Sequence, residues 1–340
     1  MDPLTQGVLG AALPQAVAVR RGGAVAAAGG FGFLAGMAAD LDILIRSGAD
    51  PLLFLEYHRQ FSHSLVFIPL GGLLAALTLY GLQKLIWRPR WPRLGFARML
   101  LFCTLGYATH GLLDGATSYG TMLFWPFSGE RLAASIVSIV DPLLTVPAAL
   151  LVVTASIRRS PLCARIALAW IGLYLSLGAV QRSAALDMAG ELAAARGHTI
   201  ARQTVKPSFG NILVWRSVYE AEGRFFVDGL RVGLAPRVWP GTSVARLDPA
   251  RDFPWLERES QQARDLDRFA RFSQDYVARD PAEPNTVIDV RYAYLPHELG
   301  ALWSIGLTPG AGPERHVRFQ TDRSQARANL AALWAMIAPR

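Results

Sequence analysis

The chain has 340 residues, of which 52% are hydrophobic and only 18% are charged, and its mean hydropathy is +0.26. A soluble domain carries about 25% charged residues, so this composition indicates an integral membrane protein. The net charge of +8 is distributed over the ends of apolar runs and forms no basic helix, which argues against nucleic-acid binding.

Six apolar segments are predicted along the first part of the chain. A membrane-spanning helix needs about 20 mainly apolar residues, and the first segment is marginal because it is short and contains Pro14. We therefore predict an all-α membrane bundle of about five to six transmembrane helices in a domain covering residues 1–183. The segments are residues 3–19, 22–39, 64–87, 98–116, 132–157 and 162–180.

Basic residues predict how the bundle is oriented. Ten of them fall at one set of helix ends, whereas four (Arg46, Arg59, Arg131 and Arg182) fall at the opposite ends. Because the side richer in Lys and Arg faces the cytoplasm, the chain is expected to be a multi-pass inner-membrane protein with an extracytoplasmic C-terminal part. The ten are Arg20, Arg21, Lys84, Arg88, Arg90, Arg93, Arg98, Arg158, Arg159 and Arg165.

Seven ionisable residues fall at the predicted non-cytoplasmic ends of the apolar segments. Ionisable groups at membrane depth are costly, so a converging set indicates a functional site. Imidazole and carboxylate together are also the donors of zinc, manganese and iron sites. The predicted metal ligands are Asp40, Asp42, His58, His63, His110, Asp114 and Asp141.

The spacing of these residues supports a common site. His110 and Asp114 are four residues apart, which places them on one helical face; Asp114 could bind a metal directly, orient the imidazole, or only satisfy it by a hydrogen bond. Asp40 and Asp42 are two residues apart, and two close carboxylates repel unless a cation or proton lies between them. Asp141 precedes a proline, where the helical backbone is interrupted.

Seven donors exceed the need of one catalytic zinc ion, which typically keeps three protein ligands and an open position. They fit either a two-metal centre or one metal with acid–base partners, so we expect one or two divalent ions, zinc or manganese, per chain. The predicted catalytic residues are Asp42 and Asp114, between which the sequence does not choose a general base, and Arg59, whose planar guanidinium suits a phosphate or carboxylate.

The first 150 residues contain five characteristic motifs, "MDPLTQGVLGAAL", "DLD", "HRQFSHSL", "GYATHGLLDGATSYGTMLFWPFS" and "VDPLL". In this order they resemble the motifs of the YdjM-like family of bacterial inner-membrane proteins, described as metal-dependent hydrolases. The resemblance implies a membrane metallohydrolase with the seven ligands given above. One position departs from the family pattern, because Gln6 follows Thr5 where members often have histidine.

Residues 184–340 have ordinary polarity and predict a small soluble α+β domain. A hairpin is expected from strands at 211–220 and 224–232, joined at "AEGR", with more strands at 286–295, 301–307 and 315–322. Helices are expected at 259–280 and 324–338. The histidines of this part show no ligand spacing and are interpreted as ordinary surface or core residues; they are His198, His297 and His316.

The leading hypothesis is a hydrolase that acts on a phosphoester or lipid-like substrate through metal-activated water at the non-cytoplasmic membrane face. A metal- or proton-coupled transporter is the alternative, because intramembrane Asp and His residues also mark ion pathways. A third hypothesis is that the protein is an assembly factor whose metal has only a structural role. The expected partners are the lipid bilayer and this substrate, while the sequence leaves the oligomeric state open.

Overall fold

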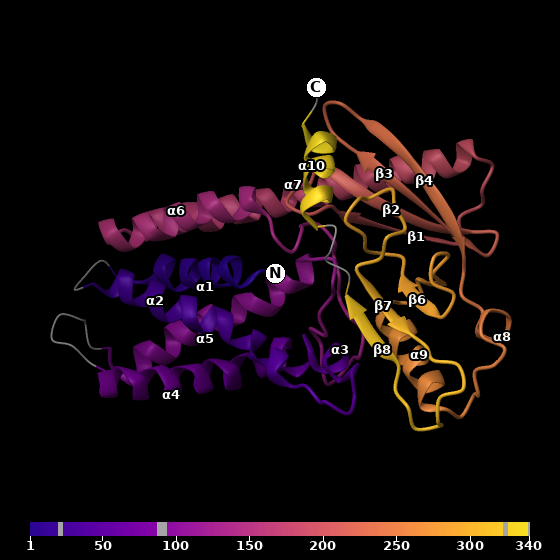
Figure 1. The fold of residues 1–340 in the computed structure, drawn as a ribbon. Helices are drawn as coiled ribbons and strands as arrows, with labels where there is room; N and C mark the ends of the chain where they lie inside the picture. The colour runs from indigo at the N-terminus through magenta and orange to yellow at the C-terminus, as the bar shows by residue number, and fades with distance from the viewer. Residues whose placement is uncertain (20–22, 87–93, 322–325, 339–340) are drawn as a thin grey trace. The chain divides into compact units, whose positions relative to one another are not determined.

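The computed structural model describes residues 1–19, 23–86, 94–321 and 326–338 (Figure 1). These residues form two compact units. The helical unit comprises Met1–Leu44 and Tyr57–Ala179, and the C-terminal unit comprises Ile45–Glu56 and Val180–Arg340. The sequence predicted a single boundary near residue 183, and it did not anticipate that residues 45–56 associate with the C-terminal unit.

In its described residues, the helical unit contains six long helices and several short ones. Asp2 caps α1, and Asp141 caps α6, in each case ahead of a proline at the first turn, where a missing N–H costs nothing. The long helices are α1 (Pro3–Val17), α2 (Ala24–Met37), α4 (Ile68–Ile86), α5 (Phe96–Ala116), α6 (Pro142–Arg158) and α7 (Pro161–Ala195), which continues into the C-terminal unit, and the short ones are η1 (Ala38–Leu44), η2 (Phe61–His63) and η3 (Leu65–Phe67). The short helix α3 (Leu53–Tyr57) lies almost wholly in the segment that belongs to the C-terminal unit.

Three of the described helical stretches are long and apolar enough to cross a membrane: Ala24–Leu44, Leu65–Leu85 and Pro161–Ala195. The expectation of five to six transmembrane helices is therefore not confirmed. α1 and α6 have 15 and 17 residues, fewer than the roughly 20 that a span needs. The predicted segment 132–157 becomes helical only at Pro142, because Leu132 pairs with Thr121 in an isolated bridge and Asp141 starts the helix.

Glycines allow α1, α2 and α5 to pack closely. A Cβ atom on Gly10 of α1 or on Gly106 of α5 would collide with the carbonyl oxygen of Gly32 on α2. Small residues at such positions let helix backbones approach, which is how helices associate where lipid supplies no hydrophobic driving force. This packing brings the ends of α2 and α5 together, and the candidate ligands lie there.

Two antiparallel four-stranded sheets form the C-terminal unit. The hairpin predicted at "AEGR" is confirmed, since β2 pairs with β3 around that turn, whereas β1 and β4 had not been predicted. The first sheet has the order β1 (Arg202–Pro207), β2 (Val214–Ala221), β3 (Arg224–Arg231), β4 (Arg237–Ala245), and the second the order β5 (Val277–Arg279), β6 (Thr286–Asp289), β7 (Trp303–Gly306), β8 (Arg318–Thr321).

In the described residues after α7, three helices accompany these sheets: α8 (Pro249–Asp252), α9 (Gln261–Phe272) and α10 (Ala326–Ile337). The helix predicted over 259–280 ends at Phe272, because Gln274 and Asp275 adopt positive φ values of 51° and 57°. The chain then turns into β5, which pairs with β6. The expected start of the last helix, Ser324, lies outside the described residues.

Residues 45–56 are fixed to the C-terminal unit by both apolar and ionic contacts. Leu52 and Leu55 are buried in one cluster with Phe269 of α9. The guanidinium of Arg268 lies 2.8 Å from a carboxylate oxygen of Asp50 and 2.6 Å from one of Glu56. These apolar contacts and ion pairs explain why residues 45–56 belong to the C-terminal unit, although they are distant from the rest of it in sequence.

Candidate metal centre

Four of the predicted ligands converge in the helical unit. Asp40 comes from η1, His63 from η2, and His110 and Asp114 lie one turn apart on α5. Nε2 of His63 lies 3.4 Å from Asp40 Oδ1 and 3.2 Å from Asp114 Oδ2. Nε2 of His110 lies 3.3 Å and 3.5 Å from the same two oxygens. Two nitrogens and two oxygens thus surround one point.

These separations fit the first coordination sphere of a metal ion. In a tetrahedral site with metal–ligand distances of about 2.0–2.1 Å, neighbouring ligand atoms lie about 3.3–3.4 Å apart. The four nitrogen–oxygen distances of 3.2–3.5 Å bracket that value. The group could therefore hold a metal ion without rearrangement of these side chains.

The hydrogen-bonding state of the same atoms supports this interpretation. Within the described part of the chain, His63 Nε2, His110 Nε2 and Asp114 Oδ2 are buried and have no hydrogen-bond partner. Buried polar atoms are almost always satisfied, because leaving one unpaired costs about 1–3 kcal/mol. Three such atoms aimed at one point form an arrangement that a bound metal ion could satisfy.

The partners of His110 and Asp114 leave the right atoms for a metal. His110 Nδ1 lies 2.5 Å from the carbonyl oxygen of Gly36, so it carries the proton and Nε2 keeps its lone pair. Asp114 Oδ1 accepts a hydrogen bond of 2.9 Å from Gln6 Nε2 and also contacts the amino group of Met1. Gln6, at the position where family members often have histidine, thus hydrogen-bonds to a candidate ligand.

Asp42 lies behind His63. Its Oδ2 accepts hydrogen bonds from the Ser62 hydroxyl (2.7 Å) and the Arg59 backbone N–H (3.0 Å), and it lies 3.2 Å from His63 Nδ1. A carboxylate that binds the far nitrogen of a metal-ligating histidine fixes its ring and its tautomer. His63 Nδ1 also lies 3.0 Å from the Ser62 hydroxyl, which donates to Asp42, so Asp42 and Ser62 are placed together where they could orient the His63 ring.

His58 forms a hydrogen bond with the other carboxylate oxygen of Asp42. His58 Nδ1 lies 2.7 Å from Asp42 Oδ1, and Asp40, Asp42 and His58 form a second group of potential ligands. The distance of 2.7 Å is typical of a hydrogen bond and is shorter than the separation of two ligands around one ion. In this geometry the pair is hydrogen-bonded, so a second ion would require His58 and Asp42 to separate.

Arg59 lies beside the site, and its backbone conformation is strained. Its φ of 62° is unusual for a residue other than glycine, and such strain concentrates at functional sites. The side chain is buried, with Nε 3.1 Å from Asp114 Oδ2 and one terminal nitrogen donating to Thr117 (3.0 Å). The Arg59 guanidinium lies 4.8 Å from the centre of the Tyr119 ring.

Arg131 places a second guanidinium at the same aromatic ring. Its carbon lies 5.8 Å from the Tyr119 centroid, and its terminal nitrogens donate to the His58 carbonyl at 3.1 Å. Neither Tyr119 nor Arg131 was singled out from the sequence. The signal was the cluster of Tyr, Trp, Phe and Arg in "TSYGTMLFWPFSGER", whose composition alone does not distinguish a site from a packed loop.

Asp141, the seventh predicted ligand, does not join the group. Its carboxylate caps α6 by accepting from the N–H groups of Leu143 and Leu144, and both oxygens lie 2.9 Å from the Tyr174 hydroxyl. The break before Pro142 was foreseen, but the side chain uses it to start the helix. These contacts satisfy the buried carboxylate without a cation.

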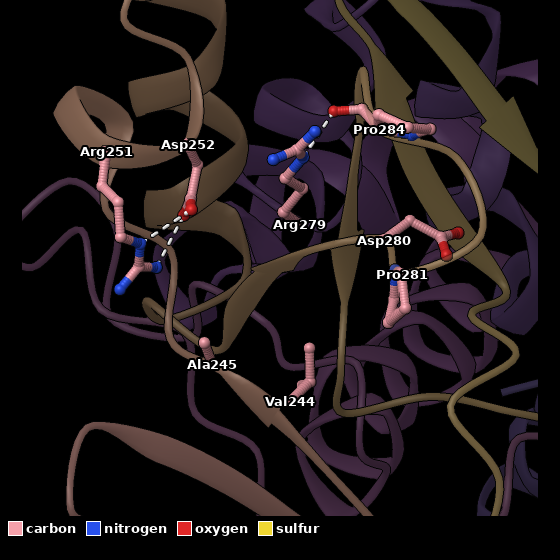
Figure 2. Close-up of a pocket in the computed structure, with 8 residues that line it drawn as sticks. All are labelled: Val244, Ala245, Arg251, Asp252, Arg279, Asp280, Pro281 and Pro284. Carbon is pink, nitrogen blue, oxygen red and sulfur yellow. Dashed lines mark hydrogen bonds and ion pairs between the residues drawn. The ribbon is translucent and has the colours of Figure 1, made fainter.

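The C-terminal unit contains two further groups of polar side chains. Asp50, Asp265 and His316 approach one another closely enough to hold an ion, but Arg268 pairs with both carboxylates and supplies the positive charge. A hollow of about 350 Å³ is bordered by Arg251, Asp252 and Arg279 (Figure 2). Arg251 pairs with Asp252 at 2.8 Å, and Arg279 donates to a backbone carbonyl, so these side chains are already engaged.

Comparison with known proteins places this site in a family context. A model of the YdjM inner membrane protein family matches residues 1–185, which include all seven predicted ligands. The chain is 38% identical over 79 residues to the inner membrane protein YbcI of Escherichia coli (strain K12); the aligned stretch covers 23% of this chain and 40% of YbcI. The chain therefore spans less than half the length of that relative. No solved structure matches the chain.

Proposed function

This chain belongs to the YdjM inner membrane protein family, and we propose that it is a membrane metallohydrolase acting on a phosphoester of lipid-like character. The proposal depends on one observation: His63 Nε2, His110 Nε2 and Asp114 Oδ2, which are buried and make no hydrogen bond to any described residue, converge with Asp40 Oδ1 on a single point. A bound divalent ion would lower the pKa of a coordinated water and polarise a phosphoryl oxygen.

The donor set bears on which ion supports hydrolysis. Two imidazoles and two carboxylates suit zinc, manganese or iron. Asp40, His63, His110 and Asp114 would hold the ion, and manganese, which takes more ligands than zinc, would leave more room for the water that hydrolysis requires. The Asp40 side chain is 23% exposed while the other three ligands are fully buried, so water reaches the centre on the Asp40 side. Finding manganese at this site would therefore support a catalytic role of the metal, and finding tightly bound zinc would support a structural role.

The residues around the metal centre have separate roles in the proposed reaction. Both carboxylate oxygens of Asp42 accept hydrogen bonds, from His58, Ser62 and the Arg59 backbone N–H. Because both oxygens are engaged, we assign Asp42 to positioning His63 and not to general-base catalysis. Asp114 serves as a ligand through Oδ2. Arg59, held over Tyr119 beside Asp114, has the fork of donors that binds a phosphate or carboxylate.

The charge of the loops supports a proposed location for the site. Ten basic residues fall at one set of helix ends and four at the other, which supports an inner-membrane protein with the metal centre and the C-terminal unit on the non-cytoplasmic side. Arg20, Arg21, Arg88, Arg90 and Arg93, which contribute to that asymmetry, lie outside the described residues. Labelling of single cysteines in intact cells tests the orientation.

Metal content is the first test of the proposal. The full chain is purified in detergent and its metals are measured by elemental mass spectrometry, for the wild type, His110→Ala and Asp114→Ala. Asp141→Asn is the matched control, because this carboxylate is equally buried but lies outside the group. We expect about one ion per chain in the wild type and the control, and none in the other two variants.

Activity is then measured on the same preparations with a chromogenic phosphodiester and with phospholipid vesicles. Hydrolysis that disappears in the metal-free variants supports the proposal. Metal bound at this site without hydrolysis of either substrate, but with ion flux in proteoliposomes, would instead establish the transporter alternative. Metal loss in Asp141→Asn equal to that in His110→Ala would contradict the assigned ligands.

A further inference from the structure

The C-terminal unit exposes large apolar side chains that its fold does not use. Single exposed apolar residues are ordinary, but Leu234 is fully exposed and Trp334 is 67% exposed. The position of these residues relative to one another is therefore informative. Among the described residues of this unit, the exposed large apolar side chains are Val180, Phe209, Leu234, Leu330 and Trp334.

Two of them lie at the same end of the first sheet. Phe209 is in the β1–β2 connection and Leu234 is at the tip of the β3–β4 hairpin. The two connections are joined by a hydrogen bond of 2.9 Å from the Val232 N–H to the Leu213 carbonyl. Adjacent connections at one sheet end thus carry an exposed Phe and an exposed Leu.

α10 extends the apolar surface from this end. Its inner face is buried, with Leu333 and Met336 packed against Val214 of β2. Leu330 and Leu333 also line an apolar hollow of about 240 Å³ together with Phe209. Leu330 therefore continues the surface that begins at Phe209, and Trp334, one turn further along α10, remains exposed.

The same sheet end lies where α7 leaves its apolar stretch. The apolar run of α7 ends at Val180, within the candidate membrane span Pro161–Ala195. A Cβ atom on Gly233, at the hairpin tip, would be 3.4 Å from the Gln181 side-chain nitrogen. The hairpin that presents Leu234 consequently packs against the first polar residue after the membrane stretch.

The charges around this surface are basic. Arg231 and Arg237 form the last register pair of the β3–β4 hairpin before its tip, and Arg182 follows Gln181 on α7. The described stretches that build this sheet end, residues 203–219, 229–247 and 326–338, contain no acidic residue. Exposed apolar side chains next to these arginines match the acyl–headgroup boundary of an anionic bilayer, where Trp is also enriched.

We infer that this end of the C-terminal unit is a membrane-docking surface. Phe209, Leu234, Leu330 and Trp334 insert into the bilayer that α7 crosses, and the neighbouring arginines face phospholipid phosphates. The occupant is the lipid surface, because the apolar patch continues from a membrane helix and its rim is basic. This inference is independent of the metal centre.

Depth-dependent fluorescence quenching tests the inference on the full chain. Cys103 and Cys163 are replaced by alanine, and single cysteines are introduced as Leu234→Cys and Glu222→Cys. Both positions are exposed, so neither substitution disturbs the core. Glu222 is the control because it lies in the β2–β3 turn, about 24 Å away along β3. Each protein carries a polarity-sensitive dye and is placed in nanodiscs of phosphatidylcholine and phosphatidylglycerol.

Nitroxide-labelled lipids should quench the dye at position 234 and leave the dye at position 222 unaffected. Equal quenching at the two positions, or none at 234, would overturn the inference. A dye at 234 that is shielded from aqueous iodide in detergent, together with disulfide-linked dimers of Leu234→Cys, would overturn it in favour of a second copy of the chain. Thermal unfolding in detergent checks that both labelled proteins are folded.

Discussion

The Oδ2 atom of Asp42 lies 3.2 Å from Nδ1 of His63, while His63 Nε2 faces the centre of the candidate metal site. The imidazole therefore connects a buried carboxylate on one side to a ligand position on the other. A carboxylate in this place raises the basicity of the histidine and fixes its ring orientation.

Replacing Asp42 by asparagine should weaken metal binding without abolishing it. The loss of the negative charge behind His63 is expected to lower the affinity about 10- to 100-fold, whereas His63→Ala should remove stoichiometric metal. Competition with a chromophoric chelator measures both. Asp141→Asn is the control, and an affinity for Asp42→Asn equal to that of the wild type would exclude the positioning role.

Gly111→Val should destabilise the helical unit and displace the loop of His63. A Cβ atom at Gly111 would collide with the carbonyl oxygen of His63, whereas nothing lies within 4 Å of a Cβ atom at Gly81. Overpacking of this kind costs about 1–3 kcal/mol. Thermal unfolding in detergent should show a lower Tm and reduced metal content for Gly111→Val, and neither change for Gly81→Ala. A Tm loss of the same size in both variants would contradict the close approach.

Arg59 should determine the binding of anions to the metal-loaded protein. Arg59→Met removes the guanidinium beside Asp114 but keeps an unbranched side chain, and Arg59→Lys retains the charge without the bidentate fork. We expect phosphate binding, measured by calorimetry, to be lost in Arg59→Met and to fall by about tenfold in Arg59→Lys. Metal content should persist in both. Unchanged phosphate affinity in Arg59→Met would show that another residue binds the anion.

Lys206 should make the C-terminal unit more stable as the pH rises above neutrality. Burial, together with the charge of Arg291, lowers the pKa of Lys206 to about 7. Between pH 7 and pH 10 the unfolded chain therefore binds more protons at this residue than the folded chain, so the free energy of unfolding increases with pH.

The expected gain from pH 7 to pH 8.5 is about 1–2 kcal/mol. It is measured on the full chain by hydrogen exchange of strands β1 and β2. Lys206→Met should remove the pH dependence and raise protection at pH 7. A variant whose protection follows that of the wild type across this range would assign the effect to another group.

Arg268→Ala should release residues 45–56 from the C-terminal unit. The side chain joins Asp50, Glu56 and Asp265, and its removal leaves the buried Asp265 without this cation. Hydrogen exchange of peptides covering residues 45–56 is expected to accelerate. Arg264→Ala, an exposed substitution on the same helix, is the control, and exchange that accelerates equally in the two variants would show that the ion pairs do not hold the segment.

The sequence could predict the features that depend on local periodicity and composition. Apolar runs indicated a membrane protein, and the family assignment on the motifs of the first 150 residues is confirmed by the match to residues 1–185. The four-residue spacing of His110 and Asp114 predicted that both lie on one face of a helix. In the structure His110 Nε2 lies 3.5 Å from Asp114 Oδ2 on α5. Turn residues at "AEGR" predicted the β2–β3 hairpin. Each of these is decided by neighbours within one helical turn or one hairpin.

Tertiary structure decided which polar groups meet. Nothing local to Asp141 shows that the Tyr174 hydroxyl reaches its carboxylate, and nothing local to Asp42 shows that it stands behind His63. The attachment of residues 45–56 to α9 through Arg268 is equally invisible in the sequence. The physical reason is that a ligand set depends on atoms placed to within a few tenths of an ångström by packing between distant helices, whereas sequence patterns specify only the face and the end of a helix on which a residue lies.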